Sequence, residues 1–282
     1  MELLPGLPND VALECLIRIP FDQFSVASSV CRGWKAEIER PEFRRHRKLS
    51  GLAQSVIVLA RARVEPTRKT HLFKHLARLV YRIMLCDPET GYWSELPPVR
   101  VSRWVADVLS LGQCRVRAGA DGRCDPVTWE SRDECKAVFH RGKFHVISGY
   151  PTNAQGRFER DAEAFDLTTQ RWDPVQEDFL DDAMCPRTCV DGSDARRLYM
   201  CRNGNVMACK NATWQVLSGL PAEVCNAAYV TTWQGKLLVI GSAKIGEPHR
   251  AYVMDLKNCK WTKLESPEEY SGHVQTGCCL EI

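Results

Sequence analysis

Histidine, cysteine and acidic side chains are the groups in this chain that could carry metal or nucleophilic chemistry. His71 and His75 are four residues apart, a spacing that places two imidazoles on one face of a helix. They lie among lysines and arginines that would repel a cation, and no third ligand accompanies them. Cys185 and Cys189 are also four apart, without the second pair that a structural zinc site requires. The sequence therefore predicts no metal site.

Other reactive patterns are equally incomplete. Asp178, Asp181 and Asp182 form an acidic stretch, but it lacks the glycine and the ligand spacing of a calcium-binding loop. The chain has no glycine-rich loop of the nucleotide-binding types and no Gly-x-Ser-x-Gly motif. We therefore expect no catalytic residue and no cofactor, and we expect a protein that binds rather than an enzyme.

Length and composition indicate where such a protein works. The chain has 282 residues, of which 44% are hydrophobic, and no apolar stretch approaches the length of a membrane span. Its first ten residues lack the basic and apolar regions of a signal peptide. The 14 cysteines are then best interpreted as reduced thiols, and we expect the protein in the cytoplasm, the nucleus or both.

Charge is unevenly distributed along the chain. Residues 40–82 contain twelve Lys and Arg against two Glu, although the whole chain has a net charge of only +3. One interpretation is a solvated protein surface. The other is a nucleic-acid-binding patch in which Arg44, Arg45, Arg47 and Lys48 contact phosphates. The few aromatic residues in this stretch offer little surface for base stacking, so nucleic acid is the less favoured partner.

Two helical patterns occupy the first forty residues. Asn9 or Asp10 can cap a helix that continues to Ile17 and is stopped by Pro20. A second helix is predicted from residue 24 to residue 38, with its apolar residues at three- and four-residue steps and its end marked by Pro41. A segment this short rarely buries enough surface to fold alone, so a partner is expected to complete its core.

The same segment resembles the F-box. An opening Leu7-Pro8, a helix-ending Pro20 and a Val-Cys-Arg-x-Trp run that ends at Trp34 fall at that motif's spacing. The resemblance implies an F-box domain at residues 1–45 that binds a Skp1-like protein and, through it, a cullin scaffold. It implies that the contacts come from nine residues: Leu7, Pro8, Val11, Leu16, Ile17, Pro20, Val30, Cys31 and Trp34.

The rest of the chain repeats itself. A Trp follows an Asp by six residues three times, and a fourth copy keeps its Trp but lacks the Asp. Apolar, β-branched runs that end in a pair of small residues recur in phase with the Trp residues. Each unit therefore predicts a small antiparallel sheet, and side-by-side stacking of such sheets would bury both faces. The positions concerned are Trp93, Ser148, Gly149, Asp166, Trp172, Trp214, Gly241, Ser242, Asp255 and Trp261.

These units resemble kelch repeats, and the two modules together resemble the plant F-box/kelch-repeat proteins. The implied fold is α+β and multidomain, with a helical F-box followed by an all-β kelch propeller at residues 46–282 of about four to five blades. The expected blades are residues 55–98, 99–134 (incomplete), 135–176, 185–221 and 223–266, and residues 272–282 supply a strand that pairs with the first blade.

The period breaks near the incomplete blade. Gly149 and Ser242 are 93 residues apart with two units between them, whereas Gly119 and Gly149, one unit apart, are separated by only 30 residues. We interpret the join at residues 119–135 as a deletion of a blade or more, and the chain as a shortened family member.

The resemblance implies that the protein is the substrate-recognition subunit of an SCF-type ubiquitin ligase, and that the F-box anchors a propeller holding the target protein. Family members are known to bind phenylalanine ammonia-lyase or type-B response regulators, and no residue here selects between these targets. Loops 150–160, 177–185 and 244–250 are the expected substrate face. The alternatives are a non-catalytic kelch scaffold, a dominant-negative short form that binds Skp1 without a substrate, and a nucleic-acid binder.

Overall fold

The computed structural model describes residues 3–64, 79–96, 132–166, 169, 171–192, 197–210, 213–268 and 271–282. The chain divides into two compact units, one of residues 1–58, 85–94 and 278–282 and the other of residues 59–84 and 95–277. Most of the incomplete blade predicted at residues 99–134 lies outside the described residues, as do His71 and His75. Within the described parts, no helix has the length and apolar character needed to cross a bilayer.

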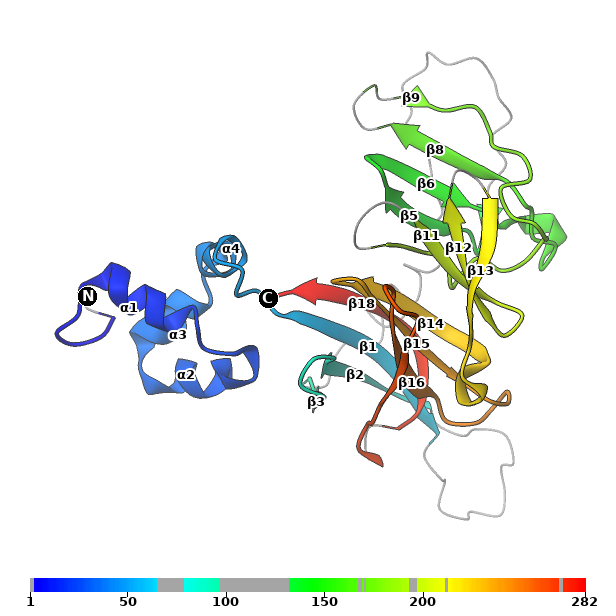
Figure 1. Ribbon diagram of the computed structural model, residues 1–282. Helices are drawn as coiled ribbons and strands as arrows, with labels where there is room; N and C mark the ends of the chain where they lie inside the picture. The colour runs from blue at the N-terminus through cyan, green and yellow to red at the C-terminus, as the bar shows by residue number, and fades with distance from the viewer. Residues whose placement is uncertain are drawn as a thin grey trace. The chain divides into compact units, whose positions relative to one another are not determined.

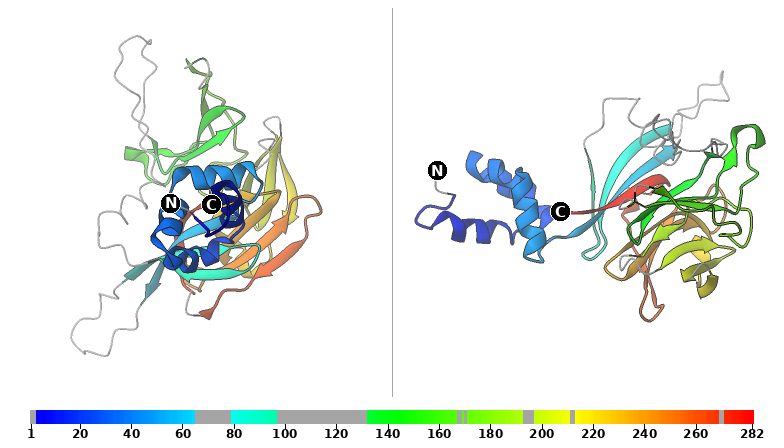
Figure 2. Two further views of the ribbon diagram at one scale, coloured as in Figure 1. Left: turned by 90° about the vertical axis from the view of Figure 1, so that its left-hand side faces the viewer. Right: turned by 90° about the horizontal axis from the view of Figure 1, so that it is seen from above.

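Four α-helices form the start of the chain, shown in blue in Figures 1 and 2. They are α1 (Asn9–Leu16), α2 (Phe24–Val30), α3 (Arg32–Ile38) and α4 (Pro41–Leu49), and a short 3-10 helix, η1 (Phe21–Gln23), precedes α2. Their shared core consists of Leu16, Ile17, Ala27, Ile38 and Phe43.

The prediction of one helix over residues 24–38 is wrong, because the chain is extended at Cys31 (φ −158°, ψ 163°). This residue separates α2 from α3, and its Sγ accepts a hydrogen bond from the backbone N–H of Trp34 (3.4 Å). Pro41, predicted to mark the end of that helix, is the first residue of α4. Proline is accommodated there because the first position of a helix needs no backbone N–H donor.

The strands that the structure describes form four four-stranded sheets and one small pair, β4 (Arg132–Asp133) with β7 (Tyr150–Pro151). Sheet 1 has the order β18 (His273–Glu281), β1 (Ser55–Val64), β2 (Leu79–Asp87), β3 (Tyr92–Glu95). Sheet 2 is β5 (Lys136–His140), β6 (Lys143–Ile147), β8 (Ala162–Asp166), β9 (Arg171–Trp172). Sheet 3 is β10 (Val190–Asp191), β11 (Leu198–Arg202), β12 (Asn205–Lys210), β13 (Thr213–Gly219). Sheet 4 is β14 (Asn226–Trp233), β15 (Lys236–Ser242), β16 (Arg250–Asp255), β17 (Trp261–Leu264).

Sheet 1 joins strands from opposite ends of the sequence. The late strand β18, red in Figure 1, lies beside β1 in the sheet that also contains Trp93 on β3. This is the pairing that the sequence predicted for residues 272–282 with the first repeat.

Sheets 2, 3 and 4 pack face to face in that order. The alternation of side chains along β11 sends Leu198 and Met200 into a core shared with sheet 2, whereas Tyr199 and Cys201 enter a core shared with sheet 4. Both faces of β11 are therefore buried. Helices followed by four sheets in a propeller-like arrangement confirm the predicted fold class.

Candidate functional site

The helical segment exposes a set of large apolar side chains. Their exposed fractions are 40% for Leu7, 43% for Val11, 59% for Val26 and 60% for Val30. Pro8, Pro20 and Cys31 are exposed as well. Exposed apolar residues gathered in a small segment are typical of a surface that a partner covers.

Not every residue predicted to contact a partner lies on the surface. Leu16 and Ile17 are buried in the helical core, where they fix the position of α1. Trp34 is half-buried, and its indole N–H donates to the backbone oxygen of Leu3 (2.6 Å). Motif spacing places a residue on a helix but does not say which face turns inward. Val26 was not among the predicted contacts, although its i, i+4 spacing to the predicted Val30 was a signal for it.

Some of the described basic residues of 40–82 make contacts within the chain. Arg47 is buried, Lys48 pairs with Glu281 (2.5 Å), and Arg82 pairs with Glu95 (3.3 Å). Buried or paired cations are poorly placed to hold a phosphate backbone, which weakens the nucleic-acid interpretation. Of the four predicted phosphate contacts, three are exposed: Arg44, Arg45 and Lys48.

The Asp that precedes three of the four repeat Trp residues has a structural role. Its carboxylate accepts hydrogen bonds from backbone N–H groups two or three residues later, which stabilises the turn before the outer strand. The acceptor and donor residues are Asp87 with Glu89 and Thr90 (2.9 and 3.3 Å), Asp166 with Thr169 (3.1 Å), and Asp255 with Lys257 (2.7 Å).

The repeat Trp residues differ in what they contact. Trp93 is buried, and Trp172 lies against Phe165 with a ring separation of 5.3 Å. Trp214 on β13 donates its indole N–H to the backbone oxygen of Phe179 (2.7 Å), in the segment between sheets 2 and 3.

Trp261 on β17 joins sheet 4 to sheet 3. Its indole N–H reaches the backbone oxygen of Gly219 (3.0 Å), at the end of β13. The last Trp of sheet 4 therefore bonds to the sheet before it along the chain.

The small-residue pairs occupy positions where a larger residue would not fit. Ser148 and Gly149 both have positive φ values (55° and 107°). A Cβ on Gly241 would lie 2.3 Å from the backbone oxygen of Asn226 on the neighbouring strand. Ser242, which follows, is buried.

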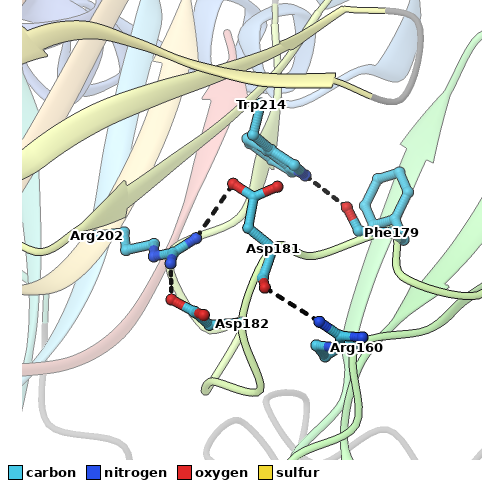
Figure 3. Close-up of polar contacts among 6 residues, drawn as sticks. All are labelled: Arg160, Phe179, Asp181, Asp182, Arg202 and Trp214. Carbon is cyan, nitrogen blue, oxygen red and sulfur yellow. Dashed lines mark hydrogen bonds and ion pairs between the residues drawn. The ribbon is translucent and has the colours of Figure 1, made fainter.

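Two of the three predicted substrate loops meet around Arg160. This side chain pairs with Asp178 and donates to the backbone oxygen of Asp181 (3.3 Å), which joins loop 150–160 to loop 177–185. Arg202 of β11 lies between the carboxylates of Asp181 (3.4 Å) and Asp182, as Figure 3 shows. The acidic stretch is thus held by two arginines. The third loop, 244–250, presents Ile245 to solvent.

The described residues contain no group of three His, Cys, Asp or Glu side chains that could hold a metal ion. Burial raises the pKa of the Cys189 and Cys201 thiols to about 12, so both stay protonated and unreactive at neutral pH. His140 of β5 contacts Asp191 of β10 (Nδ1 to Oδ1, 2.5 Å), a link between sheets 2 and 3.

Comparison with known proteins agrees with both modules. The model of the F-box domain matches residues 4–46. Two proteins of Arabidopsis thaliana, F-box/kelch-repeat protein At1g15670 and F-box/kelch-repeat protein At1g80440, are 37% and 35% identical to this chain. Both alignments cover 100% of this chain and 100% of the relative.

The relatives also carry sequence that this chain lacks. The alignment with At1g15670 runs over 363 positions, whereas this chain has 282 residues, which leaves 81 positions unfilled. That shortfall exceeds one repeat unit of about 46 residues. The prediction that the deletion lies at residues 119–135 stays a prediction, because most of this join falls outside the described residues.

An F-box at residues 4–46, four kelch-type sheets after it and 37% identity along the full length of a relative together show that this chain belongs to the F-box/kelch-repeat family.

Proposed function

We propose that this chain is the substrate-recognition subunit of an SCF-type ubiquitin ligase. Its F-box docks a Skp1-like protein that is joined to a cullin scaffold, and its propeller holds the protein to be ubiquitinated. The observation that carries this proposal is the exposure of Leu7, Val11, Val26 and Val30 in a family-matched F-box. Burial of such residues in a partner's groove is the usual source of affinity at a helix-mediated interface.

The chain acts in this proposal by tethering. Holding a target on the same assembly as a ubiquitin-conjugating enzyme raises the local concentration of the target's lysines without any bond chemistry in this subunit. The supporting observation is that the described side chains form ion pairs and buried cores, and that they include no group of three His, Cys, Asp or Glu that could hold a metal ion.

Phenylalanine ammonia-lyase and type-B response regulators are the target classes that we propose from the family resemblance. The surface around Arg160, Asp178 and Asp182 is the proposed contact region, because two predicted loops meet there and all three side chains are exposed. The shortfall against the relatives favours a second candidate, a short form that binds Skp1 but holds no target.

A matched pair of substitutions tests the docking face. Val30 and Val216 have nearly the same exposure, 60% and 63%, but Val30 lies in the F-box and Val216 on β13. We expect Val30→Glu to weaken binding of the purified chain to a Skp1-like protein at least about tenfold, since it places a charge in an apolar interface. Val216→Glu should leave the affinity unchanged, as measured by isothermal titration calorimetry.

Equal affinity of both variants would exclude this docking face, and no binding by the unsubstituted chain would exclude the adaptor function. Affinity purification from plant extract with the unsubstituted chain and with a Leu7→Ala/Pro8→Ala variant then separates the two candidates. An adaptor retains its target in the variant while losing Skp1 and cullin. A short form without the substitutions captures Skp1 and cullin. Neither it nor its substituted variant captures an ammonia-lyase or a response regulator.

A further inference from the structure

Arg47 of α4 is almost fully buried, with 1% of its surface exposed, yet within the described chain its hydrogen-bond partners include no Asp or Glu side chain. All five of its N–H groups nevertheless have acceptors. Nε donates to the backbone oxygen of Ile282 (3.4 Å). The remaining acceptors are the backbone oxygens of Ile17 (2.5 Å), Ile19 (2.6 Å) and Leu52 (2.9 Å), and Oε1 of Gln54 (3.2 Å).

Two of these acceptors belong to the end of the first F-box helix. Ile17 directly follows α1 and Ile19 lies in the turn just after it, where backbone carbonyls lack partners within the helix. The last turn of α1 contains no basic residue of its own. Arg18, just after it, donates to the backbone oxygen of Glu14, and Arg47 adds a second, buried cation at this helix C-terminus. The guanidinium also lies over the ring of Phe24 on α2, 5.0 Å from its centre. Arg47 thereby fixes α1 and α2 relative to α4.

The other acceptors belong to the start of β1 and the end of β18. The backbones of Gln54 and Ile282 exchange two hydrogen bonds of 2.9 Å each, which extends the pairing of β1 and β18 by one step. The side chain of Gln54 accepts from the backbone N–H of Phe21 (2.6 Å) as well as from Arg47. One polar network therefore contains the F-box backbone and Ile282, just after β18.

We propose that Arg47 couples the two: the F-box helices keep their binding geometry only while the end of β18 is paired beside β1. Without Ile282, the guanidinium loses one of its acceptors and Gln54 loses both backbone partners that position its side chain. A buried donor without an acceptor is destabilising, and more so when it is charged. The strain falls on the carbonyls at the end of α1, next to the exposed apolar residues.

The nearby ion pair of Lys48 with Glu281 does not provide this coupling. Both side chains are more than half exposed, and solvent-exposed pairs contribute little to stability. Loss of residues 278–282 therefore acts on the helices through Arg47 and Gln54.

Hydrogen exchange on the full chain, without any partner, tests the proposal. A chain shortened to end at Gly277 should exchange the amides of residues 12–24 about tenfold faster or more, which is the size expected for losing hydrogen bonds to a charged group. Arg47→Met should do the same. Arg45→Met is the matched control, because Arg45 lies on the same helix but is exposed, and it should leave the rates unchanged. Gln54→Leu is a milder variant for use if the shortened chain does not fold.

Combining the changes shows whether Arg47 is the link. In an Arg47→Met background, shortening the chain should add less than about twofold to the exchange of residues 12–24, because the connection is already broken. Unchanged exchange in the shortened chain, or a full tenfold addition in both backgrounds, would overturn the proposal. Since no Skp1-like protein is present, this outcome is independent of the adaptor function.

Discussion

Apolar side chains of α2 in the F-box are exposed, whereas those of β15 in sheet 4 are buried. Leu237, Val239 and Ile240 of β15 are buried, and residues of sheet 3 cover one side of this sheet. Val26 and Val30 of α2 are more than half exposed. The difference shows where each region finds its cover: a repeated sheet is covered by a neighbouring copy in the same chain, whereas the helical module leaves the same kind of side chain exposed, where we propose that a partner covers it.

The largest expected effect tests this contrast directly. Ile240→Ala should lower the free energy of unfolding by about 2–5 kcal/mol, because it leaves a cavity in a closed core. Val26→Ala should change it by less than about 0.5 kcal/mol, since the side chain is exposed in the free protein. Urea denaturation of both variants gives the two values. Similar losses would mean that α2 is covered within the chain.

A smaller effect is expected from backbone crowding in sheet 4. Gly241→Ala should cost about 1–3 kcal/mol, because the new methyl group meets the backbone of β14, which cannot rotate away. The control is Gly219→Ala at the end of β13, where a Cβ would have no atom within 4 Å. The thermal unfolding midpoint of Gly241→Ala should be clearly lower than that of Gly219→Ala. Equal midpoints would contradict the close approach of the two strands.

The smallest effect depends on pH. Burial, with added repulsion from His273 and Arg61, lowers the pKa of His249 to about 4. The neutral imidazole accepts the backbone N–H of Val274 through Nδ1 (2.9 Å). Because the folded-state pKa lies below the unfolded value of about 6.5, this stability is complete above pH 6.5 and is lost as the pH falls towards 4.

We expect a loss of about 1 kcal/mol across that interval, since partial exposure of the ring reduces the full value. His249→Asn should flatten the dependence, because its amide oxygen can accept the same hydrogen bond without titrating. The slope should not vanish, as burial also lowers the pKa of His145. Denaturation curves between pH 7.5 and 4.5 provide the measurement, and identical slopes for both proteins would exclude the role of His249.

The sequence was sufficient to predict both modules, for a physical reason. Strand period, turn residues and a Trp six positions after an Asp are patterns within a short stretch of sequence. The contacts that follow from them are simple: Asp255 accepts a hydrogen bond within its own turn, and Trp261 bonds to the preceding sheet. The F-box motif was recognised in the same way. Its inward and outward faces were not, because the same helical spacing argument applies equally to a buried Ile17 and an exposed Val30.

Arg47 could not have been predicted from its neighbours. In the sequence it is one of several basic residues in a row, and a solvated face is the ordinary interpretation of such a run. Its burial depends on carbonyl groups at residues 17, 19, 52 and 282, which only the folded chain brings together. The break at Cys31 was missed because the apolar spacing continues across it.

The pairing of β18 with β1 has a consequence for synthesis. During translation the F-box and strands β1, β2 and β3 leave the ribosome early. The strand that completes their sheet, β18, emerges only after the strands of sheets 2, 3 and 4. Sheets 3 and 4 are each built from consecutive strands and can assemble during translation. The first sheet to begin forming is therefore the last of the four to be completed, and until β18 emerges the edge of β1 stays open to a chaperone or a neighbouring chain.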